Sequence, residues 1–508
     1  MNIIKSIGLY EIAVLLLGTS SSFLIYLSLK QYLKLRRYRH IPHPKTYGLF
    51  RFFTGNLHEL QAYKNDIGFS GLILKWFNDL GPVFKVYFFG EIIVSVNGPE
   101  AVKKVTIDLD LHKNDLTYNM LAFPFNERAL GTGLVTEIDK EKWKASRALF
   151  NHAFQRNILK TFLDEFNEKS NLLMEKLRGK ADGKTLVTMF PELNKFALDI
   201  ISSVAFGFNN DSINQSENYL NKLIINLLHG INELLIDPLI QLKPNKFKMV
   251  NEFRKSLREL REFSREHINQ RIRDLENKDH VPNDILTIII KNYGGDSLDL
   301  DDLIDQFLTF FIAGQETTAN SLAFAILELG RNPEAFLKLR EEADKYIGSK
   351  NYISFEDLAN LEYTSCVFNE TLRKWPPAPE FSRKTYKEIE INGIKIPKNT
   401  WIMCSPFISG HNPEYFPEPE EFKPERFLKS SEFSQKNMIN SYTFFPFSLG
   451  PRNCIGQNFA KIEAKIFLAK FALNFDIRLD ENQSYGLKEV LTLRPKDGCR
   501  VYLTQRNF

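Results

Sequence analysis

The sequence predicts a mainly helical protein with small β-sheets, an α+β fold. Apolar residues recur with the helical period of about 3.6 residues over four long stretches, namely 157–177, 193–206, 251–277 and 298–330. Two runs rich in β-branched and aromatic residues flank Gly90 within 83–96, which predicts two strands joined by a turn. Asn392-Gly393 between isoleucines predicts a second, tighter hairpin. Helices therefore dominate the expected fold, and strands form only short pairs.

Composition indicates one large folded unit after an N-terminal segment. No Gly/Ser-rich, Pro-rich or low-complexity linker divides the 508 residues, and the chain has no internal repeat. The formal net charge of +4 is small for this length, so the charge gives no indication of nucleic acid binding. The 43 phenylalanines imply a large apolar interior.

The first expected element is a single transmembrane helix over 12–29. This stretch is free of charge, and its length matches the roughly 17 to 25 residues that cross a bilayer core. Basic residues follow at once and favour a cytosolic position for the rest of the chain; they are Lys30, Lys34, Arg36, Arg37 and Arg39. A cleaved signal peptide is the competing interpretation, but the basic cluster follows the apolar run instead of preceding it. We expect residues 1–40 to form a membrane anchor with its basic flank.

The remaining elements follow from local signals in chain order. Pro99 and Glu100, after the first strand pair, predict the start of a helix. The helix over 298–330 has clear ends, because it follows Gly294-Gly295-Asp296-Ser297, carries acidic residues in its first turns and stops before Pro333. At 1.5 Å per residue this helix is about 50 Å long, enough to cross a large domain.

The most informative stretch is 447–456, which places one cysteine in a tight loop before a helix predicted over 458–475. Gly450 and Gly456 permit backbone conformations that other residues resist, so the chain can pass close under a flat cofactor. Backbone N–H groups and the helix N-terminus favour the Cys454 thiolate over the thiol. The alternative is a small buried cysteine in a Gly-rich turn. Without CxxC pairs, an ordinary thiol role is expected for Cys366, Cys404 and Cys499.

The spacing F-x-x-G-x-R-x-C-x-G in this stretch resembles the haem-binding signature of the cytochrome P-450 monooxygenases. The resemblance implies the cytochrome P-450 fold, heme b (iron protoporphyrin IX) as cofactor and Cys454 as the metal ligand. Residues 41–508 would then be the haem-thiolate catalytic domain. Phe447 would cover the proximal side of the cofactor, and Arg452 could reach a carboxylate at its edge.

Further positions match the family's cofactor contacts. Trp143 and Arg147 form a W-x-x-x-R pattern that resembles the family helix whose polar ends meet a haem propionate, and Arg383 matches another propionate partner. The cofactor-binding residues implied in this way are Cys454, Trp143, Arg147, Arg383, Arg452, Phe447, Gly450 and Gly456.

The centre of the helix over 298–330 reads Ala313-Gly314-Gln315-Glu316-Thr317-Thr318 and resembles the family's oxygen-activating motif. Ala313 and Thr317 share one helix face, and the small residues leave room there for dioxygen and a substrate. The expected catalytic residues are Thr317, which would hold a water by hydrogen bonding, and Glu316, which would connect that water to bulk solvent. The alternative is a helix with small residues for close packing and a threonine bonded to its own carbonyls.

A structural network is also expected. Glu370 and Arg373 lie three residues apart, where an acid and a base can pair on one helical face. Arg426 follows about fifty residues later. Together the three residues resemble the family's buried Glu-Arg-Arg network that holds the cysteine loop.

Within the superfamily, the stretches 305–320, 442–450, 485–488 and 492–495 are most similar to the cholesterol 24-hydroxylase family. This implies an oxidoreductase of sterol and lipid metabolism that hydroxylates a sterol side chain. The alternatives are fatty-acid or xenobiotic hydroxylation, a haem-thiolate isomerase or dehydratase, and a non-catalytic haem sensor.

The chain departs from the cholesterol 24-hydroxylase family at Glu380, in a segment that lines the substrate cavity. Expected pocket residues are Phe123, Phe125, Phe310, Ala313, Ala378, Phe381, Val490 and Leu491.

The resemblance also implies partners and a location. Electrons would come from NADPH through NADPH-cytochrome P-450 reductase, and the other partners would be O2, a hydrophobic small-molecule substrate and membrane lipid, with no nucleic acid. A single-pass anchor in the endoplasmic reticulum membrane would hold the catalytic domain in the cytosol.

Overall fold

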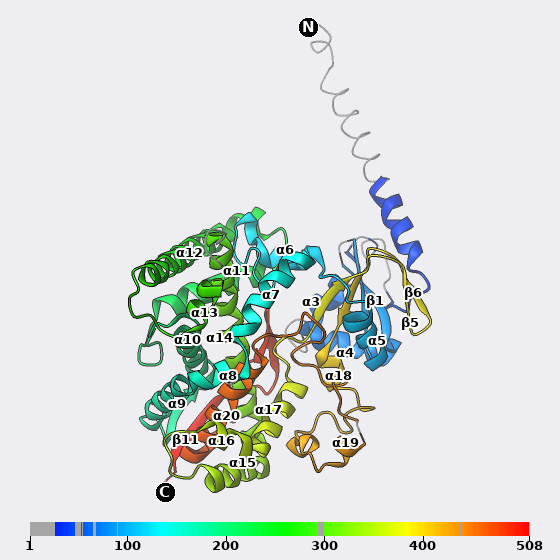
Figure 1. Cartoon of the computed structure of the whole chain (residues 1–508). Helices are drawn as coiled ribbons and strands as arrows, with labels where there is room; N and C mark the ends of the chain where they lie inside the picture. Colours follow the sequence, from blue (N-terminus) through cyan, green and yellow to red (C-terminus); the bar gives the residue numbers. More distant parts are fainter. Residues whose placement is uncertain are drawn as a thin grey trace.

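Helices make up most of the structure, a computed structural model that describes residues 26–45, 52, 54–63, 68–88, 90–292, 299–436 and 438–506. Helices α6 to α17 and α20 form one large body, and most of the strands lie in a smaller region beside it (Figure 1). The prediction of a mainly helical fold with small β-sheets is confirmed.

The helices of the described residues are α3 (Leu57–Tyr63), α4 (Gly68–Leu80), α5 (Pro99–Lys103), α6 (Asp115–Ala122), α7 (Lys140–Ala153), α8 (Arg156–Leu159), α9 (Leu163–Arg178), α10 (Met189–Phe206), α11 (Tyr219–Ile236), α12 (Phe247–Glu276), α13 (Ile285–Asn292), α14 (Leu300–Arg331), α15 (Pro333–Tyr346), α16 (Phe355–Asn360), α17 (Glu362–Lys374), α18 (Pro406–Gly410), α19 (Glu432–Gln435) and α20 (Gln457–Asn474). The strands are β1 (Val83–Phe88), β2 (Glu91–Val96), β3 (Asp182–Thr188), β4 (Phe381–Lys384), β5 (Ile389–Ile391), β6 (Ile394–Ile396), β7 (Trp401–Cys404), β8 (Phe475–Leu479), β9 (Leu487–Glu489), β10 (Leu493–Pro495) and β11 (Arg500–Gln505).

The largest sheet has the strand order β1-β2-β7-β4. Its first two strands form the predicted antiparallel pair, with Phe88 opposite Glu91, while β2 and β7 run parallel. The hairpin of β5 and β6 turns at Asn392 and Gly393, whose φ angles of 49° and 75° are those of the tight turn that an Asn-Gly pair favours. A second sheet, β3-β11-β8, joins segments about 300 residues apart in the sequence and was not predicted.

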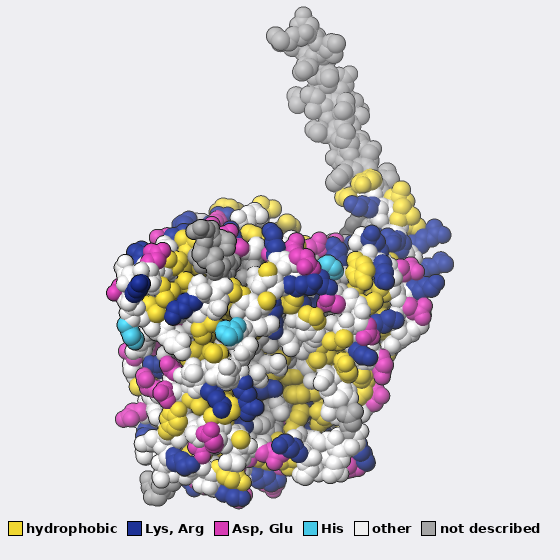
Figure 2. Space-filling view, in the orientation of Figure 1, with side chains coloured by type: hydrophobic (Ala, Val, Ile, Leu, Met, Phe, Trp, Pro, Cys, Tyr) yellow, Lys and Arg dark blue, Asp and Glu magenta, His cyan; other side chains and the backbone are white. Residues whose placement is uncertain are grey.

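The N-terminal segment extends from the body as a helix over residues 26–37 (Figure 1). Lys and Arg side chains gather around the base of this helix (Figure 2). The predicted membrane span over 12–29 lies mostly outside the described residues, which begin at Tyr26. Among the residues that are described, none of the helices has the length and apolar character needed to cross a bilayer.

Tyr38 shows that the globular packing begins before residue 41. Its ring is buried with the core of the largest sheet, and its hydroxyl lies 2.8 Å from Thr400 Oγ1. The side chain of Lys85 also donates to the Tyr38 carbonyl. The basic flank therefore ends in a residue that belongs structurally to the folded body.

The long helices lie close to their predicted positions, with one difference. The stretch predicted as one helix over 157–177 is divided into α8 and α9 by a 3₁₀ turn, Lys160–Phe162. Because a 3₁₀ turn also places residues i and i+3 on one side, the apolar pattern does not reveal the division.

Helix α14 forms the centre of the core. It begins at the N-cap Asp299, whose carboxylate accepts from the N–H groups of Asp301 and Asp302, and most of its residues are buried. Helix α10 packs along it so closely that a Cβ at Gly314 would lie 2.9 Å from the side chain of Ile201.

The start of α14 is fixed by ion pairs around Asp305. Its fully buried carboxylate accepts from Arg261 of α12 at 2.7 Å and from Arg128 of the loop after α6 at 2.9 Å. The N–H of Thr132 donates to it at 2.9 Å. One carboxylate thus joins three segments that are distant in the sequence, and two cations neutralise it.

We expect Asp305→Asn to lower the free energy of unfolding by about 2 to 3 kcal/mol, because it leaves two guanidinium groups without their buried counter-charge. The loss is smaller than for a fully buried pair, since the Arg128 side chain is 35% exposed. The shift of the urea unfolding midpoint, followed by circular dichroism, measures it. As a control, Asp301→Asn alters a carboxylate that is 49% exposed and should shift stability by less than about 1 kcal/mol. Equal shifts for the two variants would contradict this account of Asp305.

Candidate active site

A mostly apolar cavity of about 300 Å³ lies between α14, the segment that leads from α17 into β4, and the loop 447–456. Cys454 opens into this cavity from the loop. Ala313 and Thr317 line it from α14, and Ala378 and Phe381 line it from the segment around β4. The structure therefore brings the predicted cysteine loop and the predicted oxygen motif to the same internal space.

The loop that carries Cys454 is held by its own backbone and by neighbouring segments. The N–H of Cys454 donates to the carbonyl of Phe447 at 2.8 Å. Gly450 has a φ of 73°, and a Cβ there would lie 2.3 Å from the carbonyl oxygen of Thr106, so only glycine fits. Gly456, the N-cap of α20, has an ordinary φ of −81°. The expected passage of both glycines close under a flat cofactor stays a prediction, and the close contact seen here is that of Gly450 with Thr106.

The groups around the Cys454 sulfur shift the pKa of its thiol in opposite directions. Burial raises the pKa of the thiol, while the N–H of Gly456 and the positive charge of Arg147 lower it. Burial is the largest effect, so the start of α20 does not by itself produce the expected thiolate. A metal ion bonded to the sulfur would displace its proton.

Basic side chains gather at one side of the cavity: Lys113, Arg147, Arg383 and Arg452. None of the four forms an ion pair with a carboxylate of the described residues; Arg452 donates to the Glu137 carbonyl at 2.7 Å, and its guanidinium lies 4.0 Å from the centre of the Trp143 ring. Burial and the nearby Arg383 lower the pKa of Arg452 to about 10. Burial and these two arginines also hold the pKa of Lys113 well below its usual range.

Lys113 and Arg383 are buried, and Arg147 and Arg452 are half-buried. Such a group of cations favours an anion beside it, since an uncompensated buried charge is unfavourable. A flat cofactor with two carboxylates at its edge would supply the anion, and its metal would bind the Cys454 sulfur. The residues present therefore fit heme b. Arg147 has a second contact, because its guanidinium donates to the carbonyl and the side-chain oxygen of Asn453 at 2.7 and 2.9 Å and so braces the cysteine loop.

The two predicted catalytic residues lie on different sides of α14. Thr317 lines the cavity, and its hydroxyl donates to the carbonyl of Ala313 at 2.8 Å, which is the helical back-bond of the alternative interpretation. Glu316 is buried on another face, where burial raises its carboxyl pKa and Thr492 and Arg494 are its neighbours. Its side chain does not line the cavity.

The predicted Glu-Arg-Arg set is brought together and fully buried. Arg373 donates to both carboxylate oxygens of Glu370 at 2.8 and 2.9 Å, and Arg426 donates to the same group at 3.3 Å. Arg373 also donates to the Gly410 carbonyl at 2.6 Å. The two guanidinium groups share this one carboxylate and also donate to backbone carbonyls, so the protein itself holds the cluster together.

The predicted pocket residues separate into two groups. Phe310, Ala313, Ala378 and Phe381 line the cavity. The others lie elsewhere: Phe123 is 44% exposed, Phe125 is buried against Phe253, and Val490 and Leu491 do not line the cavity.

The cavity also has lining residues that the sequence reasoning did not assign, among them Lys113, Ile201 and Thr309. Thr309 lies four residues before Ala313, so helical periodicity could have identified it. Lys113 lies in an irregular stretch, and no sequence signal marks it.

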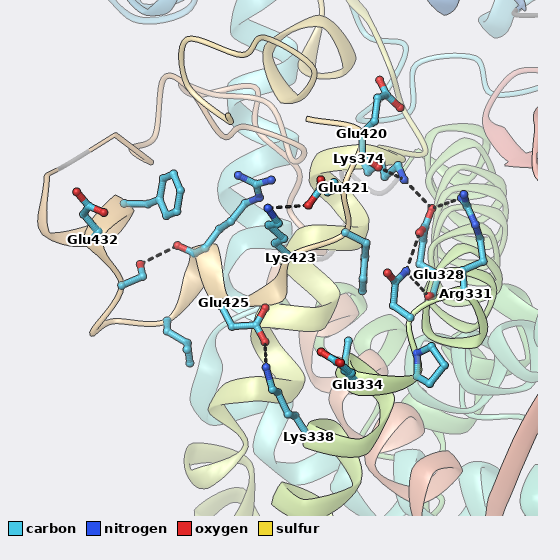
Figure 3. Close-up of a pocket in the computed structure, with 18 residues that line it drawn as sticks. Glu328, Arg331, Glu334, Lys338, Lys374, Glu420, Glu421, Lys423, Glu425 and Glu432 are labelled. Atoms are coloured by element: carbon cyan, nitrogen blue, oxygen red, sulfur yellow. Dashed lines mark hydrogen bonds and ion pairs between the residues drawn. The ribbon is translucent and has the colours of Figure 1, made fainter. Parts of the chain in front are cut away.

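A second, larger hollow of about 880 Å³ lies on the protein surface (Figure 3). It is lined by charged side chains that pair with each other, such as Lys338 with Glu425 at 2.7 Å and Lys374 with Glu328 at 3.1 Å. Among the described residues, it shares no lining residue with the Cys454 cavity, and the charges of its buried Glu328 and Lys374 are already paired. We therefore assign the chemistry to the smaller cavity.

Comparison with known proteins supports this assignment. The family model described as Cytochrome P450 matches residues 48–498. Cytochrome P450 4V2 of Rattus norvegicus is 32% identical over 404 residues, which cover 76% of each protein. Cytochrome P450 3A29 of Sus scrofa is 29% identical over 457 residues, which cover 84% of this chain and 87% of the relative. With the family match over most of its length, the chain belongs to the cytochrome P450 family of monooxygenases, which use heme b.

Proposed function

We propose that Cys454 Sγ binds the iron of heme b and that the protein inserts one oxygen atom from O2 into a hydrophobic substrate, a sterol side chain. The observation that carries this proposal is the position of Cys454, whose sulfur faces an apolar cavity beside four basic side chains that form no ion pair with a carboxylate of the described residues. When bound, haem iron with a thiolate ligand supplies the activation of O2.

The protein residues would hold and orient the cofactor. Arg452, Arg383 and Lys113 would neutralise its two carboxylates, and Trp143 would keep the Arg452 guanidinium in place by stacking. Phe447 would cover the side from which the cysteine approaches. The paired Glu370 cluster, which contacts none of these residues directly, would keep the chain before the cysteine loop in position.

Thr317 would supply the hydroxyl that holds a proton near the reacting oxygen. Its Oγ1 now bonds the Ala313 carbonyl, and rotation about χ1 would turn it toward the cavity. A proton path through Glu316 would have to leave the cavity behind α14, toward Thr492. The apolar walls would exclude bulk water, so that protons arrive only along such a path.

The sterol side chain is the substrate we favour, because the stretches 305–320 and 442–450 are similar to the cholesterol 24-hydroxylase family and the cavity walls are mainly apolar. Electrons would come from NADPH-cytochrome P450 reductase. Exposed lysine side chains on the cysteine side of the cavity, such as Lys142 and Lys461, are suited to an acidic partner.

We also propose that residues 1–40 anchor the catalytic domain, residues 41–508, on the cytosolic side of the endoplasmic reticulum membrane. The connection between α11 and α12 provides a second apolar contact, because Leu239 and Leu242 are 64% and 70% exposed and Phe247 is 50% exposed. Several exposed apolar side chains within one short stretch of the chain favour insertion into the lipid interface.

The test of the proposed function is Cys454→Ser. An alcohol is a poor anionic ligand at neutral pH, so the reduced carbon-monoxide complex should lose its thiolate Soret band, and hydroxylation should stop. Cys366→Ala, which changes a buried thiol outside the cavity, is the matched control and should keep the band. A Cys454→Ser protein that retained the thiolate band would show that another group binds the iron.

Thr317→Ala should keep the haem and the substrate-induced spin shift, because both depend on the cysteine and the cavity walls. NADPH consumption should continue, with more electrons released as hydrogen peroxide and product formation lowered by roughly 100 to 10000 fold, the usual contribution of general acid–base groups. Thr317→Ser retains a hydroxyl and should restore much of the coupling. If Thr317→Ala keeps the wild-type ratio of product to NADPH, the residue has only its helical back-bonding role.

Deletion of residues 2–29 should weaken membrane attachment and leave the haem bound, since Tyr38 and the residues after it are retained. Sedimentation with membranes and the carbon-monoxide spectrum measure the two properties. We expect partial binding to remain through the α11–α12 connection, and the added double change Leu239→Glu and Leu242→Glu should remove it. Undiminished sedimentation of the truncated protein would contradict the anchor.

A further inference from the structure

One carboxyl group lies in the wall of the apolar cavity. Glu380 precedes β4, and it lines the same space as Cys454, Ala313 and Phe381. Its Oε1 atom is buried and has no hydrogen-bond partner. The hydroxyls of Ser70 and Ser405 lie near the carboxyl group, but an unpaired buried oxygen is unfavourable unless a ligand or water completes its bonding. The Oε1 atom is therefore suited to a hydrogen-bonding partner in the cavity.

A second carboxyl group, that of Glu489 on β9, lies beside Glu380. The backbone N–H and the hydroxyl of Ser70 donate to Glu489 at 2.9 and 3.1 Å. A Cβ at Gly68, where φ is 67°, would lie 2.7 Å from Glu489 Oε2, so the start of α4 encloses this carboxylate closely. Burial raises the pKa of the Glu489 carboxyl, and the Ser70 donors offset only part of this effect.

The two carboxyl groups therefore have different environments. Ser70 donates to Glu489, whereas Glu380 lines the cavity beside Glu489. Burial and the neighbouring Glu489 raise the pKa of Glu380 well above its usual range. Among the described residues, no lysine or arginine forms an ion pair with either group, and the basic side chains of the cavity gather around Arg452. The raised pKa favours the protonated form of Glu380, which can both donate and accept a hydrogen bond.

We propose that Glu380 is a specificity-determining residue, which hydrogen-bonds a hydroxyl group at one end of an uncharged, otherwise apolar substrate. The inference rests on the proposed function, because it takes the Cys454 cavity as the substrate site. The two neighbouring carboxyl groups have no ion-pair partner among the described residues, so a substrate carboxylate would be repelled there and free fatty acids are disfavoured at this position. An apolar end without a hydroxyl would leave Glu380 unpaired.

A purely structural role would give a different result. If Glu380 only helped α4 pack against β9, its replacement would alter stability but would affect all ligands of one carbon skeleton alike. The preference between ligands that differ in one polar group therefore separates recognition from packing.

The experiment uses the full-length, haem-loaded protein and titrates the spin shift with two ligand sets. One set is cholesterol, cholest-5-ene and cholesterol sulfate, and the other is hexadecan-1-ol, hexadecane and hexadecanoate. In each set we expect the wild type to bind the alcohol about 10-fold more tightly than the hydrocarbon, the effect of one hydrogen bond to a buried group. The anion should bind most weakly.

Glu380→Leu should reduce the alcohol-to-hydrocarbon ratio to about 1, and Glu380→Gln, which keeps a donor and an acceptor, should retain most of it. Glu489→Gln should raise the relative affinity for the anions by removing their repulsion. The inference is overturned if the wild-type protein binds the hydrocarbon as tightly as the alcohol, or binds the anion most tightly, even if Glu380→Leu fails to fold. It is also overturned if Glu380→Leu keeps the wild-type ratio of alcohol to hydrocarbon affinity. If the wild-type protein shows no thiolate Soret band, the proposed function is overturned, and the inference with it.

Discussion

The structure depends on holding one sulfur atom, that of Cys454, at an apolar cavity while its loop is fixed from outside. The loop is fixed by an internal bond to the Phe447 carbonyl, by close packing of Gly450 against Thr106 and by the Arg147 guanidinium on Asn453. These contacts come from separate parts of the chain. The position of the sulfur is thus set by the whole fold, and local loop geometry alone would not be sufficient.

The protein buries arginines in two ways, and the difference separates structural residues from binding residues. Arg373 and Arg426 share the Glu370 carboxylate and carbonyl oxygens, so their charges are satisfied without any ligand. Arg452 and Arg383 lie beside each other, no carboxylate of the described residues forms an ion pair with either, and their proximity lowers the pKa of Arg452. A cofactor that carries two negative charges would offset this repulsion, so its binding would also stabilise the fold.

Elements with local sequence signals were predicted correctly, whereas features that depend on contacts between distant segments were not. Helix α14 was expected over 298–330 and runs from Leu300 to Arg331, because its caps and apolar period are local. The sheet β3-β11-β8 was not predicted, since its pairing joins distant segments. Within the site, a fixed motif predicted that Cys454 would face a cofactor space. Phe125 shows the limit, because aromatic character alone does not reveal that the ring packs on Phe253 instead of facing the cavity.

Helix α14 is secured at both ends and packed along its middle. The Asp305 ion pairs hold its first turns, and near its last turn Glu328 accepts from Lys374 and from the indole N–H of Trp375 (Figure 3 shows the lysine). Between them, Ile201 of α10 leaves no room for a side chain at Gly314, and Gln315 donates to Asn221 at 3.1 Å. In mechanical terms the cavity has one stiff wall. A molecule that enters must adapt to α14, and any widening has to come from the other walls, the segment around β4 and the loop 447–456.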